Sequence, residues 1–126
     1  MNSAVKNLNF RTVFDAAADA MLLTENTGHI VLANPTAQQL LGYSADEMKG
    51  LAIEMLIAPR YRKQYRYYQR LFLNRPVKRS MSVGNELIAL NRDGKEILLD
   101  ISLSPIKTGQ QLFILILFTI ANRRLD

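Results

Sequence analysis

The residues of this chain that could carry out chemistry are few and scattered. There is one histidine, His29, and no cysteine among the 126 residues. The lack of cysteine excludes disulfides, thiolate metal sites and a cysteine nucleophile. Ser102 and Ser104 lie on the polar side of an alternating segment without a histidine partner, and the carboxylates show no paired spacing. We therefore expect neither an enzyme nor a metal site, and we expect His29 to be a solvated turn residue.

Aromatic side chains between residues 59 and 74 form the densest group of candidate functional residues. Their i, i+4, i+7 and i+11 spacing predicts one face of a helix over residues 59–74, with a proline suited to its first turn. A phenol hydroxyl at the edge of an apolar cavity can orient one polar group of a ligand. A fully packed core would require the same pattern, so both interpretations stay open. These residues are Tyr61, Tyr65, Tyr68 and Phe72.

The net charge of +5 comes from one segment. Residues 60–79 hold eight of the sixteen basic side chains and no acidic one, so the rest of the chain is net negative. A solvated helix face explains this segment, and an acidic partner protein or an anionic membrane surface would explain it too. Nucleic acid is not expected as a partner, because the aromatic side chains share the inner face of the helix instead of alternating with the charged ones. The basic face consists of Arg62, Lys63, Arg66 and Arg70.

Two strands and two short helices are predicted before this helix. Residues 20–24 and 29–33 are apolar runs, and Gly28 in the turn between them can adopt a positive φ. Asn34 suits the N-cap of the first short helix, and Pro35 suits its first position.

The end of this first short helix and the start of the second also have capping signals. Gly42 suits a left-handed C-cap. Ser44 and Glu47 have the spacing of a capping box, in which the hydroxyl and the carboxylate each satisfy a free amide.

The C-terminal half is predicted to be sheet. Residues 81–91 form a strand that leads to a hairpin turn at Asp93-Gly94. Residues 97–103 alternate apolar with mostly polar side chains, and a turn is expected at residues 105–110. The final strand, residues 112–121, is apolar at consecutive positions, so both of its faces need cover. At ten residues it is too short to cross a bilayer as a helix, which requires about 20.

An amphipathic helix is predicted near the N-terminus, capped by Asn9 or Thr12. Its apolar positions have i, i+3, i+4 and i+7 spacing, and so short a helix needs packing for stability. These positions are Phe10, Val13, Phe14 and Ala17. It could pack on its own sheet or on a second copy, and the apolar final strand favours a homodimer. The candidate dimer contacts are Phe10, Phe14, Phe113 and Leu115.

Taken in order, these segments resemble a PAS domain, the sensory module of bacterial signalling proteins. The resemblance rests on residues 19–50 and on the segments ELIALNRDGKEI and DISLSPI, and it covers about residues 9–124. It implies an α+β fold: a five-stranded antiparallel sheet with short helices and one longer helix on one face. Residues 1–18 would then be an N-terminal helical cap and dimerisation segment, residues 19–121 the PAS core, and residues 122–126 the start of a linker.

The resemblance also implies a cavity between the sheet and the long helix. PAS domains that bind haem place an axial histidine where this chain has Tyr65, and flavin photosensors of the family need a reactive cysteine. Histidine-ligated haem and cysteinyl-flavin photochemistry are therefore not expected. A non-covalent flavin, a small apolar or aromatic ligand, and an empty core all stay open. The candidate cavity residues are Tyr65, Tyr68, Met81 and Ile101.

The function implied by the resemblance is sensory, without an enzymatic activity of its own. A cytoplasmic location is expected because the chain has neither the apolar core of a signal peptide nor an apolar run long enough to span a bilayer. The domain would bind a small ligand or cofactor, form a homodimer, or both, and so control a C-terminal effector such as a kinase or a cyclic-dinucleotide enzyme. The alternative is a ligand-free protein-interaction PAS domain that binds an acidic partner through the basic face.

Overall fold

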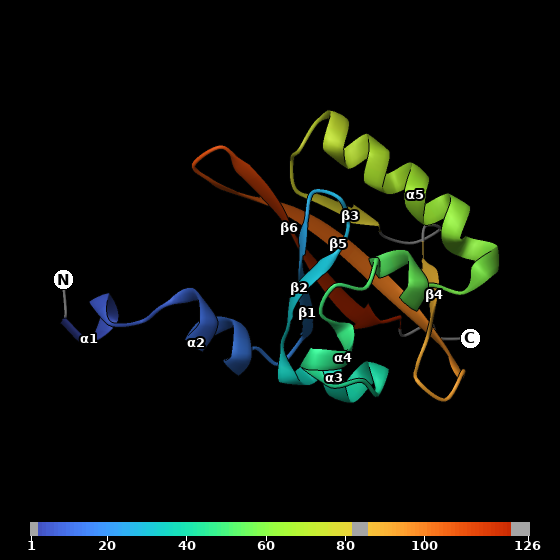
Figure 1. Cartoon of the computed structure of the whole chain (residues 1–126), viewed down its shortest axis with the longest axis horizontal. Coiled ribbons are helices and arrows are strands. Elements are labelled where there is room, and N and C mark those ends of the chain that lie inside the picture. Colours follow the sequence, from blue (N-terminus) through green and yellow to red (C-terminus); the bar gives the residue numbers. More distant parts are fainter. Residues whose placement is uncertain (1–2, 82–85, 122–126) are drawn as a thin grey trace, which may run out of the picture.

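The computed structural model describes residues 3–81 and 86–121 (Figure 1). Its helices are α1 (Ser3–Lys6), α2 (Phe10–Ala16), α3 (Pro35–Leu41), α4 (Ala45–Met48), the 3-10 helix η1 (Ile53–Leu56) and α5 (Pro59–Asn74). Its strands are β1 (Ala20–Glu25), β2 (Ile30–Ala33), β3 (Arg79–Met81), β4 (Leu87–Leu90), β5 (Glu96–Thr108) and β6 (Gln111–Ile120).

The strands form one antiparallel sheet in the order β2-β1-β6-β5, with β3 and β4 beyond β5. Strands β3 and β4 pair with successive stretches of β5, so the sheet is five strands wide. The predicted α+β fold with a five-stranded antiparallel sheet is therefore confirmed. Ala20, at the start of β1, lies opposite Phe118, near the end of β6. The chain thus enters and leaves this sheet on neighbouring strands.

The predicted capping residues form the hydrogen bonds expected of them. Asn34 Oδ1 accepts from the amide of Ala37 at 2.9 Å and starts α3. Gly42 ends α3 with a φ of 77°, in the left-handed region. Ser44 and Glu47 form the predicted capping box at the start of α4. Short-range hydrogen bonding therefore fixes where these small helices begin and end.

The core lies between one face of the sheet and α5. Leu22, Ile101 and Ile116 project from the sheet, while Tyr65 and Phe72 project from α5, and each is at most 1% exposed. The predicted helix over residues 59–74 is confirmed, as is its inward aromatic stripe, because the other two aromatic residues of that stripe also pack against the core.

One prediction for the C-terminal half needs correction, and another falls partly outside the described residues. The turn expected at residues 105–110 is wrong, because β5 continues through Pro105 to Thr108 and turns at Gly109. Beyond Leu103, β5 pairs only with β6 in the described part of the sheet, so a residue without an amide hydrogen is tolerated there. The strand expected over residues 81–91 appears as the end of β3 and as β4, and residues 82–85 lie outside the described residues.

The N-terminal segment forms α1 and α2, which extend away from the sheet in Figure 1. The helix predicted near the N-terminus is confirmed as α2, with Asn9 Oδ1 as its cap. Of its apolar residues, Phe14 is buried, whereas Phe10 and Val13 are 44% and 58% exposed. The helix therefore covers its own domain with Phe14 and presents Phe10 and Val13 to solvent, while Ala17 is half-buried just after the helix.

Candidate functional site

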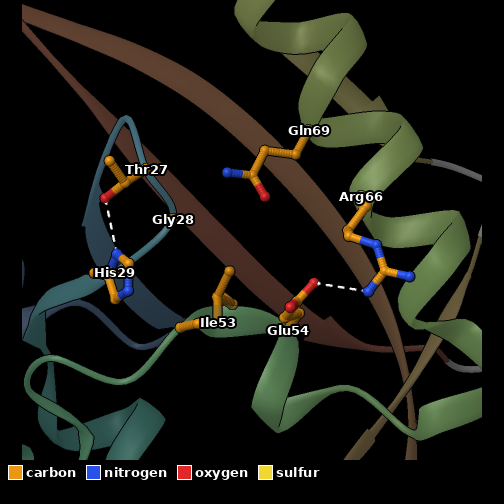
Figure 2. Close-up of a pocket in the computed structure, with 8 residues that line it drawn as sticks. Thr27, Gly28, His29, Ile53, Glu54, Arg66 and Gln69 are labelled. Carbon is orange, nitrogen blue, oxygen red and sulfur yellow. Dashed lines mark hydrogen bonds and ion pairs between the residues drawn. The ribbon is translucent and has the colours of Figure 1, made fainter.

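A cleft of about 350 Å³ opens between the β1–β2 turn, η1 and α5. Figure 2 shows side chains from all three elements around it, and its volume lies near the lower end of the range for small-molecule sites. Two of these elements are placed by contacts already described: the turn by the β1–β2 pairing, and α5 by its buried aromatic face. The cleft is lined by Thr27, Gly28, His29, Ala52, Ile53, Glu54, Arg66 and Gln69.

Gly28 sets the wall of the cleft on the side of the turn. Its φ is +89°, and a Cβ added there would lie 2.8 Å from Gln69 Nε2. The Gly28 carbonyl accepts from the amide of Ile53 at 2.9 Å, which ties the turn to η1. The turn can thus approach both η1 and the Gln69 side chain because residue 28 has no side chain of its own.

The polar groups around the cleft are arranged in two pairs and one single side chain. Thr27 Oγ1 lies 2.9 Å from His29 Nδ1, and Arg66 Nη1 lies 3.1 Å from Glu54 Oε2. The Gln69 carboxamide points from α5 toward the turn (Figure 2). Since donors and acceptors face each other across the opening, the cleft can hold a small polar molecule by hydrogen bonds.

Three of the four predicted cavity residues lie in the core that α5 covers or pack against it. Tyr65 and Ile101 belong to the buried core, and Tyr68 packs against it half-buried. Met81 lies in β3, but its side chain is outside the described part of the structure. Burial raises the pKa of the Tyr65 phenol, and the nearby Glu54 carboxylate raises it further. Tyr65 therefore stays neutral and can act as a donor or acceptor, not as an anion.

The cleft was not predicted from the sequence. His29 was expected to be a solvated turn residue; it is exposed, as expected, and also lines the cleft. Gln69 and Arg66 lie on the flank of α5 between its core and solvent faces. The signal in the sequence was the polar Thr27-Gly28-His29 turn, but nothing local indicates which helix it faces.

The predicted dimer residues lie in two places. Phe10 stacks on Phe14 with 5.1 Å between ring centroids, and only Phe14 is buried. Phe113 and Leu115 are half-buried on the face of β6 that points away from the core. Leu115 lies opposite Leu23 of β1 in the sheet, which extends the apolar surface. The structure does not bring the two groups together within one chain.

A family model described as PAS domain matches residues 18–121. The chain belongs to the PAS domain family.

Solved structures share this fold over 90% or more of the chain. The PAS domain of a protein from Colwellia psychrerythraea is 21% identical, with a TM-score of 0.80, and the match covers 98% of this chain and all of that one. The PAS domain of nitrogen regulation protein NR(II) from Vibrio parahaemolyticus is 19% identical, with a TM-score of 0.70 and coverage of 90% and 100%. The LOV protein of Rhodobacter sphaeroides is 20% identical, with a TM-score of 0.79 and coverage of 98% and 70%.

The basic face of this PAS domain is partly engaged in its own fold. Arg62 Nε donates to the carbonyls of Glu54 and Ile57, each at 3.0 Å, and Arg66 is paired with Glu54. Lys63 and Arg70 are exposed. The four residues predicted as one docking face therefore divide into two that hold α5 against η1 and two that are available to solvent.

Residues 3–81 and 86–121 contain no group of three or more acidic or histidine side chains that could hold a metal ion. Within the same ranges, no helix is long and apolar enough to cross a membrane.

Proposed function

We propose that this PAS domain is the sensory part of a signalling protein. In this proposal it acts as a homodimer, binds a small polar molecule in the cleft and thereby controls an effector that follows it in the chain. The fold it shares with the PAS domain of nitrogen regulation protein NR(II) is consistent with such a role.

The observation that carries the proposal is the apolar surface that the domain presents to solvent. On α1, α2 and the segment between them, four apolar residues are between 44% and 58% exposed. On the outward face of β1 and β6, five apolar side chains are half-buried: Met21, Leu23, Phe113, Leu115 and Leu117. Burying such surface against a second copy stabilises by about 25 cal/mol per Å². The exposed residues of the N-terminal segment are Val5, Leu8, Phe10 and Val13.

The cleft supports the ligand part of the proposal. A molecule that bridges Gln69 on α5 and Thr27 or His29 on the turn would fix α5 relative to the β1–β2 hairpin. The turn is continuous with β1, and β1 pairs along its length with β6. A shift of the β1–β2 hairpin would therefore also move β6 and the outward face of β1 and β6, which is part of the proposed dimer surface.

Native mass spectrometry of the purified protein tests both parts of the proposal. The expected spectrum has a dimer mass with a stoichiometric small molecule, which is lost from a Gln69→Ala/His29→Ala variant that stays dimeric. The variant separates ligand binding from assembly because neither residue lies on the apolar surface. A wild-type spectrum showing only the mass of one unliganded chain would contradict the proposal.

A further inference from the structure

The outward face of α5 contains fewer free cations than the sequence suggests. Of the five basic residues on this helix, three are bound within the domain. Arg60 binds both carboxylate oxygens of Glu96 at 2.7 and 2.8 Å, while Arg62 and Arg66 bind η1 as described above. These contacts hold α5 by one flank to β5 and by the other to η1.

Lys63 and Arg70 remain available for a partner. Both are exposed, and in the described part of the chain neither side chain has a hydrogen bond or an ion pair. They are two helical turns apart, a separation of about 10 Å along the axis. Because α5 is held by its core face and its flanks, the backbone positions from which the two charged side chains extend are fixed.

Two apolar side chains lie beside these charges. Tyr67 is 55% exposed and Leu71 is 38% exposed, whereas Tyr65 and Phe72 of the same helix are buried. Tyr67 is four residues after Lys63, and Leu71 follows Tyr67 by another four, so the three form one row along the helix. We call Lys63, Tyr67, Arg70 and Leu71 the outer α5 surface.

We propose that the outer α5 surface binds an acidic amphipathic helix of a partner protein. Carboxylates spaced about two turns apart on the partner match Lys63 and Arg70, and an apolar side chain between them packs on Tyr67 and Leu71. A straight surface of about two turns fits another helix, which can pack its ridges into the grooves of α5. This inference does not depend on the cleft or on dimerisation.

The same observations disfavour the other anionic partners. Nucleic acid binding depends on many phosphate contacts, but Lys63 and Arg70 are the only basic residues of α5 that are not bound within the described part of the domain. A membrane-binding helix needs a wide apolar face to insert among the lipids, but the wide apolar face of α5 is buried in the core. An acidic helix needs only the narrow mixed row that α5 presents.

Fluorescence anisotropy with a defined probe tests the proposal. The probe is a labelled synthetic helix with glutamates flanking a leucine stripe, and its control is a scrambled peptide of the same composition. The test variants are Lys63→Glu/Arg70→Glu and Tyr67→Ser. The matched control is Lys95→Glu/Lys107→Glu, which makes the same change of net charge at two exposed lysines outside α5. Circular dichroism checks that each variant is folded.

The wild type is expected to bind the ordered helix more tightly than the scrambled peptide. Lys63→Glu/Arg70→Glu should weaken that binding by about tenfold or more and Tyr67→Ser by several-fold, while the control pair changes it by less than about twofold. Equal weakening by the control pair, equal binding of the scrambled peptide, or no binding of the ordered helix would overturn the proposal. Binding of anionic vesicles or duplex DNA in preference to the ordered helix would also overturn it.

Discussion

The side chain of Asn34 donates from Nδ2 to the backbone carbonyl of Phe14, at 3.2 Å, and so joins the N-terminal helix to the PAS core. The same carboxamide donates to the carbonyl of Asp19 at 2.9 Å and accepts from the amides of Met21 and Ala37, each at 2.9 Å. One buried residue thus connects the end of α2, the start of β1 and the start of α3. It lies where movement of the N-terminal segment would be passed to the sheet.

Replacing Asn34 with alanine should lower the free energy of unfolding by about 3 kcal/mol, because it removes a helix cap and leaves buried backbone groups without partners. Asn34→Asp keeps the accepting oxygen but places a carboxylate against the carbonyls of Phe14 and Asp19, so it should also be destabilising. Urea denaturation followed by circular dichroism measures both. Wild-type stability in both variants would contradict the assigned role.

Gly28→Ala should be more destabilising than Gly50→Ala, although both glycines have nearly the same positive φ, 89° and 88°. Alanine in that conformation costs about 1–2 kcal/mol at either position. Only at Gly28 would the added methyl group meet another side chain, that of Gln69, which adds about 1 kcal/mol. The comparison is made by urea denaturation, with Gly28→Ala/Gln69→Ala as the variant that relieves the contact. Equal effects at the two glycines would show that the turn and α5 are farther apart.

The Glu47 carboxylate should make folding stability depend on pH in the acidic range. Its pKa is lowered by the hydrogen bond from the backbone of Ser44 and by the contact with Arg92. A lowered folded-state pKa means that the stabilisation is complete above the ordinary glutamate value of about 4.3 and is lost as pH falls through the lowered value. Urea midpoints measured across this range should fall less steeply in Glu47→Gln than in the wild type. If the urea midpoints of Glu47→Gln and the wild type fell equally with pH, the Glu47 carboxylate would not be a source of the pH dependence of stability.

Tyr65 should contribute to stability in its neutral form only. Its pKa is raised mainly by burial, so this contribution is complete below the ordinary tyrosine value of about 10 and is lost as pH rises beyond it. As pH is raised above this value, the free energy of unfolding should therefore fall less in Tyr65→Phe than in the wild type. At neutral pH, Tyr65→Ala should lower the free energy of unfolding by about 3–5 kcal/mol. Denaturant midpoints at neutral and alkaline pH test this, and a Tyr65→Ala variant of wild-type stability would show that the ring is not in the core.

The features that were predicted from the sequence are those set by short-range rules. Asn34, Gly42 and the Ser44–Glu47 pair act on backbone groups within a few residues, so their signals are local. The aromatic spacing on α5 specifies its buried face because side chains three and four residues apart share one side of a helix. Period-two alternation likewise identified the inward residues of β5.

The features that sequence did not predict depend on residues distant in the chain. The cleft combines positions near 28, 53 and 69, and the partners that bind Arg60 and Arg66 are 36 and 12 residues away. Spacing alone also could not separate Phe14, which is buried, from Phe10, which is not. That difference depends on where Asn34 fixes the end of α2. A turn was also expected at Pro105. In the structure this residue lies in β5 opposite Ile114, beyond the stretch that pairs with β3, and this pairing cannot be read from the sequence around Pro105.

If this PAS domain forms a homodimer through its exposed apolar surfaces, sedimentation velocity of the wild type and of Leu115→Glu will show it. We expect a wild-type dimer and a folded Leu115→Glu monomer. The control Lys107→Glu, at an exposed position near the end of β5, should remain a dimer. A wild type that sediments as a monomer at all concentrations, or a Leu115→Glu variant that remains a dimer, would contradict the proposed homodimer.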